Sequence, residues 1–252
     1  MLEPSLLFAL AIIFAAMLVR SVAGFGDVIV ALPLLTTLLG LNDAVALMAL
    51  LGLTSSLTLA LSSWHDINWR AIRPYLLASC MGVPLGLLVL QHAPEAWLLG
   101  ILGVLISLFG VYNLIVPKAS TQSASSTSGS STSGSSPAWL TYPLGLFGGI
   151  LGSAYGVLGP PVVLYSSLQG WSPAMFRATL QGYFVLTFVF IVGGHSLAGL
   201  WNQQVWSLYV LSLPLVGIAA YVGTRITQRL TAAYFERLVY AGITILGIML
   251  IF

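Results

Sequence analysis

Arg20 and Asp27 are two ionisable residues that flank a glycine-containing break in apolar sequence near the start of the chain. An ionisable side chain within a membrane-spanning segment is costly, so it is a candidate functional residue by default. Arg20 could attract or coordinate an anion, whereas Asp27 would repel one unless its carboxyl were protonated or paired. We therefore keep two interpretations: a structural pair, or an acid that carries a coupling proton. If the flanking segments cross the membrane fully, both residues are instead ordinary loop charges.

Two breaks of this kind occur, one in each half of the chain. The first contains Gly24 and Gly26, and the second contains Gly159 followed by Pro160. A helix that starts at such a break has N–H groups without intrahelical partners and about half a positive charge at that end. It can therefore bind an anion without a basic side chain. Two such breaks are typical of a transporter site near the membrane midplane; the alternative is that the glycines only allow close helix packing.

Polar residues near the second break could complete such a site. Tyr155, Tyr165, Gln169 and Gln181 could orient an anion, or they could merely form hydrogen bonds between helices. Arg177 could belong to the substrate route, or it could only mark the cytoplasmic side of the membrane.

His195 is a lone histidine in a long apolar segment, where it could handle protons or bond to a neighbouring helix. The candidate residues fall into two groups by role. The substrate-binding candidates are Arg20, Gly24, Gly26, Tyr155, Gly159, Pro160, Tyr165, Arg177 and Gln181, and the proton-coupling candidates are Asp27 and His195.

The composition requires a membrane environment for these residues. Of the 252 residues, 58% are hydrophobic and 6% are charged, whereas soluble domains carry roughly 25% charged residues. The sequence therefore predicts an integral membrane protein. The eight basic residues are scattered singly and form no stripe for nucleic acid. The single cysteine, Cys80, excludes an internal disulfide and a multi-thiolate metal site, and we expect no metal and no cofactor.

The elements that must position the candidates repeat along the chain. Each half reads as a short apolar arm, a break, a second short arm and three full spans. The first half has arms at 6–19 and 28–39 and spans at 44–62, 74–90 and 96–116; the second has arms at 140–151 and 162–168 and spans at 172–200, 205–221 and 231–252. We predict a first repeat at 1–117, a flexible Ser/Gly/Thr-rich cytoplasmic linker at 118–137 and a second repeat at 138–252.

The basic residues indicate how the repeats are oriented. If each pair of arms returns the chain to the side it entered, the three spans invert the second half relative to the first. The loop arginines and the linker lysine then share one side, which marks the cytoplasm. The predicted fold is an all-α polytopic membrane protein with two inverted repeats, each a broken or hairpin helix pair plus three transmembrane helices. Arms that cross fully have the same parity, so that alternative stays open.

Several motifs resemble the sulfite exporter TauE/SafE family over nearly the whole chain except the linker. They are the runs 23–35, 43–47, 68–70, 82–86, 159–165 and 176–180. The resemblance implies a multi-pass carrier in a bacterial-type inner (plasma) membrane that exports small sulfur-containing or carboxylate anions such as sulfite or sulfonates. One residue departs from the pattern, since Asp27 stands where the family often has glycine.

These observations predict a secondary transporter, working as an exporter, of a small organic or sulfur-containing anion, with proton coupling as an option. A passive anion channel is the alternative. An intramembrane hydrolase using Ser153 and His195 is a rival class, but the serine lacks the glycine that usually follows and no third group orients the histidine; we expect no enzyme. The expected partners are a small anionic substrate and the lipid bilayer, without nucleic acid, and a homo-oligomer is one assembly the sequence allows.

Overall fold

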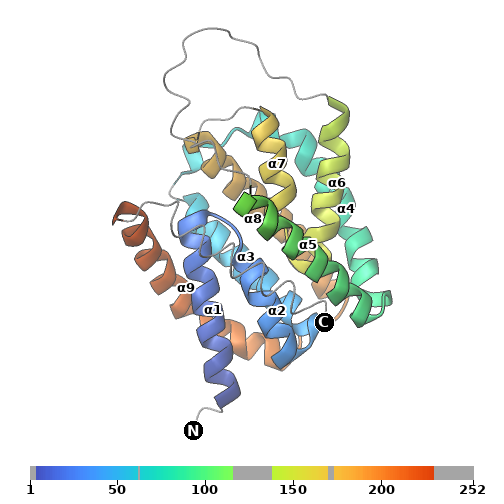
Figure 1. The fold of residues 1–252 in the computed structure, drawn as a ribbon, viewed down its shortest axis with the longest axis vertical. Helices are drawn as coiled ribbons and strands as arrows, with labels where there is room; N and C mark the ends of the chain where they lie inside the picture. Colours follow the sequence, from blue (N-terminus) through green and yellow to red (C-terminus); the bar gives the residue numbers. More distant parts are fainter. Residues whose placement is uncertain (1–3, 62, 116–137, 170–172, 230–252) are drawn as a thin grey trace.

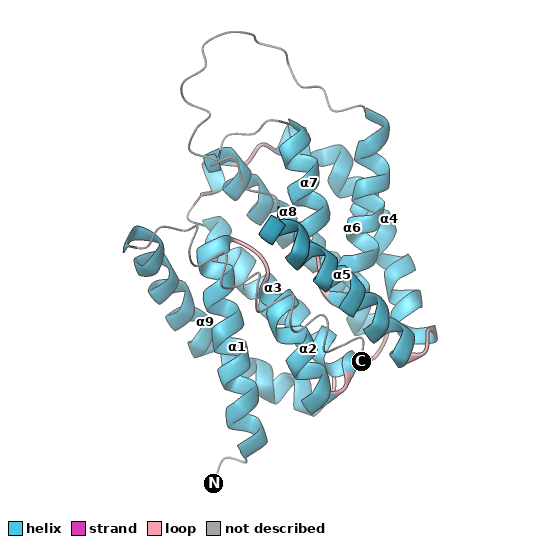
Figure 2. Ribbon diagram, in the orientation of Figure 1, coloured by secondary structure: helices cyan, strands magenta, loops and turns pink. Residues whose placement is uncertain are grey.

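The computed structural model describes residues 4–61, 63–115, 138–169 and 173–229, and within these ranges the regular structure is entirely helical (Figure 2). The elements are α1 (Pro4–Ala23), α2 (Asp27–Leu39), α3 (Leu41–Leu61), the short 3₁₀ turn η1 (Trp64–Asp66), α4 (Trp69–His92), α5 (Glu95–Ile115), α6 (Ala138–Tyr155), α7 (Gly159–Gln169), α8 (Pro173–Leu197) and α9 (Gln203–Arg229). The predicted all-α class is confirmed. The predicted linker and last span lie outside the described residues.

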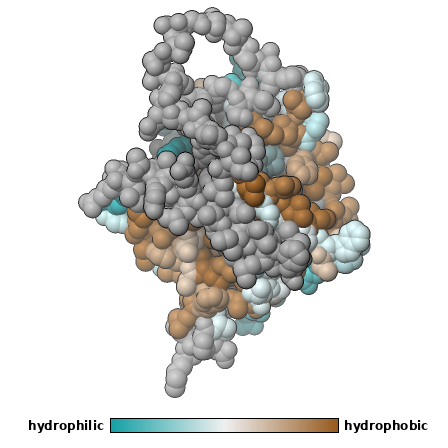
Figure 3. All heavy atoms as spheres, in the orientation of Figure 1, coloured by the Kyte–Doolittle hydropathy of each residue, from teal (hydrophilic) through white to brown (hydrophobic). Residues whose placement is uncertain are grey.

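Five of the described helices are long and apolar enough to cross a membrane. They are Ser5–Ala23, Leu41–Leu61, Trp69–His92, Met175–Leu197 and Gln203–Gly223. Hydrophobic residues also cover much of the coloured surface in Figure 3, and large apolar side chains such as Leu108 on α5 and Val210 on α9 are exposed. An apolar exterior of this kind requires lipid around it. The protein is therefore a multi-pass membrane protein, as predicted.

Each break joins a long helix to a short one. The prediction that the first arm ends at Val19 is wrong, because α1 continues through Arg20 and is 20 residues long. The physical reason is that the charge of Arg20 is compensated inside the protein and need not end the helix. The second helix of each pair is short, because α2 has 13 residues and α7 has 11. Their lengths are about 20 and 16 Å, less than the ~30 Å thickness of a bilayer core.

Among the described helices, the most extensive contacts join a helix of the first half to a helix of the second half. In Figure 1, α1 lies beside α9 on one flank and α4 lies beside α6 on the other, with α3 and α8 in contact between them. Within each break pair, α2 returns along α1 and α7 returns along α6. This packing of one half against the other brings the two breaks together. The inverted relation of the halves and the domain limits stay predictions.

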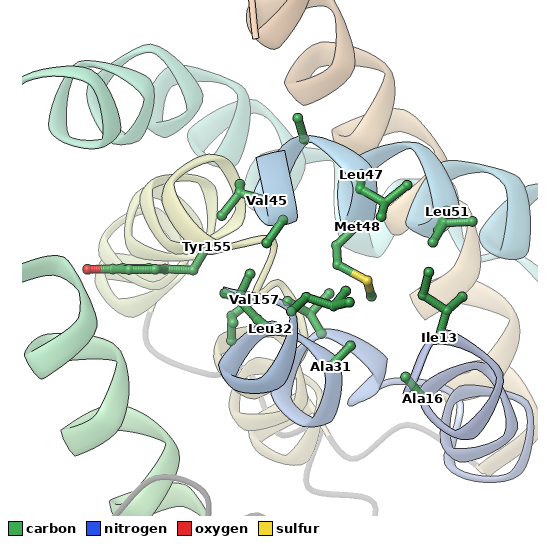
Figure 4. Packing of buried hydrophobic residues seen from close by; sticks show 14 of the residues in the cluster. Ile13, Ala16, Ala31, Leu32, Val45, Leu47, Met48, Leu51, Tyr155 and Val157 are labelled. Atoms are coloured by element: carbon green, nitrogen blue, oxygen red, sulfur yellow. The ribbon is translucent and has the colours of Figure 1, made fainter. Parts of the chain in front are cut away.

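The core around the first break is apolar and tightly filled. Figure 4 shows Ile13 of α1, Leu32 of α2 and Met48 of α3 pointing toward one another, and all three side chains are fully buried. The α4–α6 contact is closer still, because a Cβ atom at Gly82 or Gly149 would overlap a backbone oxygen of the facing helix. Small residues allow such backbone approach in membranes, and this contact fixes α6 and hence the second break.

Candidate functional site

The two glycine breaks touch each other. Gly24, Gly26 and Gly156 have φ angles of 88°, 98° and 73°, a left-handed region that residues with a Cβ rarely adopt. A Cβ built on Gly156 would lie 3.2 Å from a methyl carbon of Val28, and one on Gly159 would lie 2.7 Å from the ring of Phe25. The glycines therefore serve both to turn the chain and to let one break seat against the other.

Arg20 and Asp27 form an ion pair at this meeting point. Nη1 of Arg20 donates to both carboxylate oxygens of Asp27, at 2.8 and 2.9 Å, and Nη2 donates to the hydroxyl of Ser56 on α3. Both ionised residues are 2% exposed, so neither is a loop charge. The structure thus brings together the two residues that the sequence proposed as a pair.

The rest of the surroundings of Arg20 are aromatic and apolar. Its Cζ atom lies 5.2 Å from the ring centroid of Phe184 and 5.9 Å from that of Phe188, both on α8, which is within cation–π range. Ser56 in turn donates to the carbonyl of Gly52 at 2.6 Å. The Nε atom of Arg20 is buried without a hydrogen-bond partner among the described residues.

A small cavity of about 10 Å³ opens onto the pair, roughly the volume that one water molecule needs. Its lining comes from α1, both breaks and α8: Arg20, Phe25, Gly26, Asp27, Val28, Ile29, Gly156, Val157, Leu158, Gly159, Phe184 and Phe188. Arg20 also borders a second cavity of about 10 Å³ between α1, α3 and α9, where Ser21, Ser55 and Thr58 supply hydroxyl groups. The guanidinium therefore lies between two small spaces.

The two helix starts at the cavity differ in what they can donate. Asp27 is the first residue of α2, and the preceding Gly26 makes no side-chain cap, so the positive end of that dipole already faces a carboxylate. Helix α7 starts at Gly159 and continues with Pro160 and Pro161. Proline has no N–H, so α7 contributes its dipole with fewer donors than an ordinary helix start.

Gln181 of α8 completes the contact between α8 and the first break. Its Nε2 atom donates to the carbonyl of Gly24 at 2.8 Å, and its buried Oε1 atom has no partner among the described residues. Arg177 lies one turn earlier on the same helix, but it is exposed and does not line the cavity. The structure therefore places Gln181 at the break and Arg177 outside it.

The tyrosine candidates lie in the packing around the breaks rather than in the cavity. The Tyr165 hydroxyl donates to the carbonyl of Ala71 at 3.0 Å and accepts from Gln169 at 2.9 Å, and its ring stacks on Tyr75 with centroids 4.8 Å apart. Tyr155 is buried beside the core of Figure 4, where its ring extends away from the other labelled side chains. The contacts of Tyr165 with Ala71 and Tyr75 join α7 to α4, as the second interpretation of the sequence expects.

His195 is fully buried and lies away from the cavity lining. Its Nε2 atom is 3.0 Å from the carbonyl oxygen of Ser153, and its Nδ1 atom has no partner among the described residues. The hydroxyl of Ser153 donates instead to the carbonyl of Gly149 at 3.0 Å. The serine–histidine contact that a hydrolase requires is therefore not formed by these two residues.

Three residues of the site escaped sequence reasoning. Ser56 is one of several hydroxyl residues on α3, and only the three-dimensional packing reveals which of them faces Arg20. Phe184 and Phe188 carried a usable signal, because residues four apart share one face of a helix. Within the described residues no group of three His, Cys, Asp or Glu side chains could hold a metal ion.

Comparison with known proteins shows what the chain is similar to. The family model for the sulfite exporter TauE/SafE matches residues 8–250. A curated protein of Cupriavidus necator, named probable sulfite/organosulfonate exporter TauE, is 26% identical over 238 residues, which cover 90% of this chain and 86% of that protein. No solved structure matches the chain.

Proposed function

This chain belongs to the sulfite exporter TauE/SafE family, and from that premise we propose that it is a secondary transporter that exports a small sulfur-containing or organic anion. Sulfite, a sulfonate or a short carboxylate is the expected cargo. The relative from Cupriavidus necator is named as a probable sulfite/organosulfonate exporter, and this name favours a sulfur oxyanion over a carboxylate as the cargo.

The observation that carries the proposal is the convergence of both breaks on one buried guanidinium. Arg20 is 2% exposed, and the starts of α2 and α7 border the same cavity. A buried cation and two positive helix ends attract an anion without exposing it to lipid. We propose that the anion binds here, near the membrane midplane.

The other candidates have secondary roles in this scheme. Gln181 holds the carbonyl of Gly24 and thereby fixes the shape of the first break. The tyrosines hold the helices around the site, and Arg177, exposed on the first turns of α8, attracts anions toward the entry. Asp27 and His195 are the two residues proposed to exchange protons during transport.

The test is transport by purified protein in liposomes loaded with sulfite, methanesulfonate or acetate. A pH gradient should drive net anion movement, and Gly26→Leu or Gly159→Leu should abolish it, because the side chain fills the space at the break. Arg20→Gln should also abolish transport, because it removes the cation on which both breaks converge and leaves the Asp27 carboxylate without its hydrogen-bond donor. Failure of all three anions to move would refute the proposal.

A passive anion channel remains the second candidate, and the same vesicles separate it from a carrier. A channel gives a reversal potential set by the anion gradient alone, whereas a coupled carrier shifts that potential with the pH gradient. If the current reverses at the equilibrium potential of the anion under every pH gradient, the protein is a channel and not a coupled carrier.

A further inference from the structure

We propose that Asp27 is a tethered competitor of the transported anion: it holds the hydrogen bonds of Arg20 that the anion must take over, and it accepts a proton when displaced. The inference rests on the proposed function and adds to it the class of head group and the number of protons. It names Ser56 as a third member of the site.

The hydrogen-bond donors at both ends of the Arg20 guanidinium are already in use. Nη1 donates to both oxygens of Asp27 and Nη2 donates to Ser56, while the rings of Phe184 and Phe188 lie within 6 Å of the guanidinium carbon. The cavity beside the pair has room for about one water molecule. An oxyanion cannot bind beside the carboxylate in this space, so it must replace it.

The net charge of the site also requires that Asp27 be neutralised when an anion binds. Arg20 and Asp27 cancel each other, and a further anion would leave an uncompensated negative charge in a buried site, which is strongly unfavourable. From α3 the pair faces the Ser56 hydroxyl, from α7 Gly159, and from α8 two phenylalanine rings. None of these groups ionises, and arginine stays protonated. Among the described neighbours, only protonation of Asp27 restores neutrality.

The exchange balances in atoms and charge. A hydronium ion of the aqueous phase gives up one proton and leaves as water, and that proton forms an O–H bond on the carboxyl of Asp27 as its two hydrogen bonds to Arg20 break. The anion then accepts those hydrogen bonds, and the guanidinium keeps all its protons. The site is neutral before and after, so one proton accompanies one singly charged anion. The glycines before Asp27, Gly24 and Gly26, have left-handed φ angles and provide the freedom for the carboxyl to swing away.

The displaced group defines the substrate class. Asp27 presents two oxygens to one nitrogen of Arg20, at 2.8 and 2.9 Å, with the serine hydroxyl as a neighbour. A sulfonate, sulfite or carboxylate head group offers the same pair of oxygens, whereas a halide does not. The site is thus selective for oxyanions of carboxylate-like spacing.

The experiment compares wild-type protein with Asp27→Asn in calorimetric titrations with methanesulfonate and with sulfite. Asparagine keeps the shape but not the negative charge, so we expect affinity to rise about 10- to 100-fold, or about 1.4–2.8 kcal/mol, with no remaining pH dependence for methanesulfonate. Asp43→Asn is the matched control, because Asp43 is also a carboxylate held at 2.9 Å, by Asn202, but outside the cavity; its affinity should equal that of wild type.

A second measurement needs no variant. Titrating wild-type protein with methanesulfonate in buffers of different ionisation enthalpy should report close to one proton taken up per anion, since methanesulfonate itself does not titrate near neutral pH. If wild type binds anions without proton uptake and Asp27→Asn binds no tighter, the competitor role is wrong while the proposed function stands. If neither protein binds either anion, both proposals fall.

Discussion

Removing Arg20 alone should destabilise the protein far more than removing the whole ion pair. Arg20→Met leaves the Asp27 carboxylate buried at 2% exposure without its partner, and breaking a buried pair in this way costs about 3–5 kcal/mol. The two lost charged hydrogen bonds, at roughly 1.5–3 kcal/mol each, give a similar figure. In the double variant Arg20→Met/Asp27→Asn both charges are gone, and we expect stability within about 2 kcal/mol of wild type.

The assay is reversible chemical unfolding of the purified protein in mixed micelles, analysed as a double-mutant cycle. The coupling free energy between the two positions should exceed about 2 kcal/mol. Arg73→Met serves as the control, since Arg73 is exposed and surface changes cost about 0.5 kcal/mol or less. If the double variant is as unstable as the sum of the single variants, the pair is not the compensated unit that the geometry indicates.

Three further predictions follow from other contacts. Gly159→Ala should abolish anion-dependent thermal stabilisation by pushing aside the aromatic ring 2.7 Å from its new Cβ, whereas Gly217→Ala, with no atom within 4 Å, should leave it unchanged. Tyr165→Phe should cost about 1 kcal/mol in unfolding free energy and leave anion affinity intact; lost affinity would place its hydroxyl in the site. In a Cys80→Ser background, Glu95→Cys should react with an impermeant maleimide in whole cells and Arg73→Cys should not, and the reverse pattern would contradict the predicted orientation.

The architecture was largely predictable because its signals are local. Glycine-rich interruptions of apolar sequence marked both breaks, and the low charge content required a membrane. The end of α1 was predicted wrongly because Arg20 looks like a helix boundary until its counter-ion is placed. A charge that is compensated from the next helix does not interrupt the one that carries it.

The site was predictable only in part because its partners come from distant helices. Arg20 and Asp27 could be named from their neighbourhood in sequence, but the alternatives of pair and loop charge needed the fold. Ser56 reaches Arg20 from α3, and no periodicity singles it out among the hydroxyl residues of that helix. Phe184 and Phe188 share one face of α8, but only the fold shows that this face meets Arg20. The two prolines after Gly159 mark a helix start correctly, yet they also remove donors that an anion would use.

The short spacing of the ion pair has a consequence for how the protein is made. Ribosomes add roughly 5–20 residues per second, so Asp27 follows Arg20, seven residues earlier, within about a second. Phe184 follows only after roughly 10–30 s at the same rate. An arginine without a counter-ion is costly in an inserting segment, Arg20 lies in the last turn of α1, and α1 must enter the bilayer long before α8 exists. Its counter-ion emerges with the hairpin itself, so the arginine can be neutralised during insertion, before the aromatic wall around it has been synthesised.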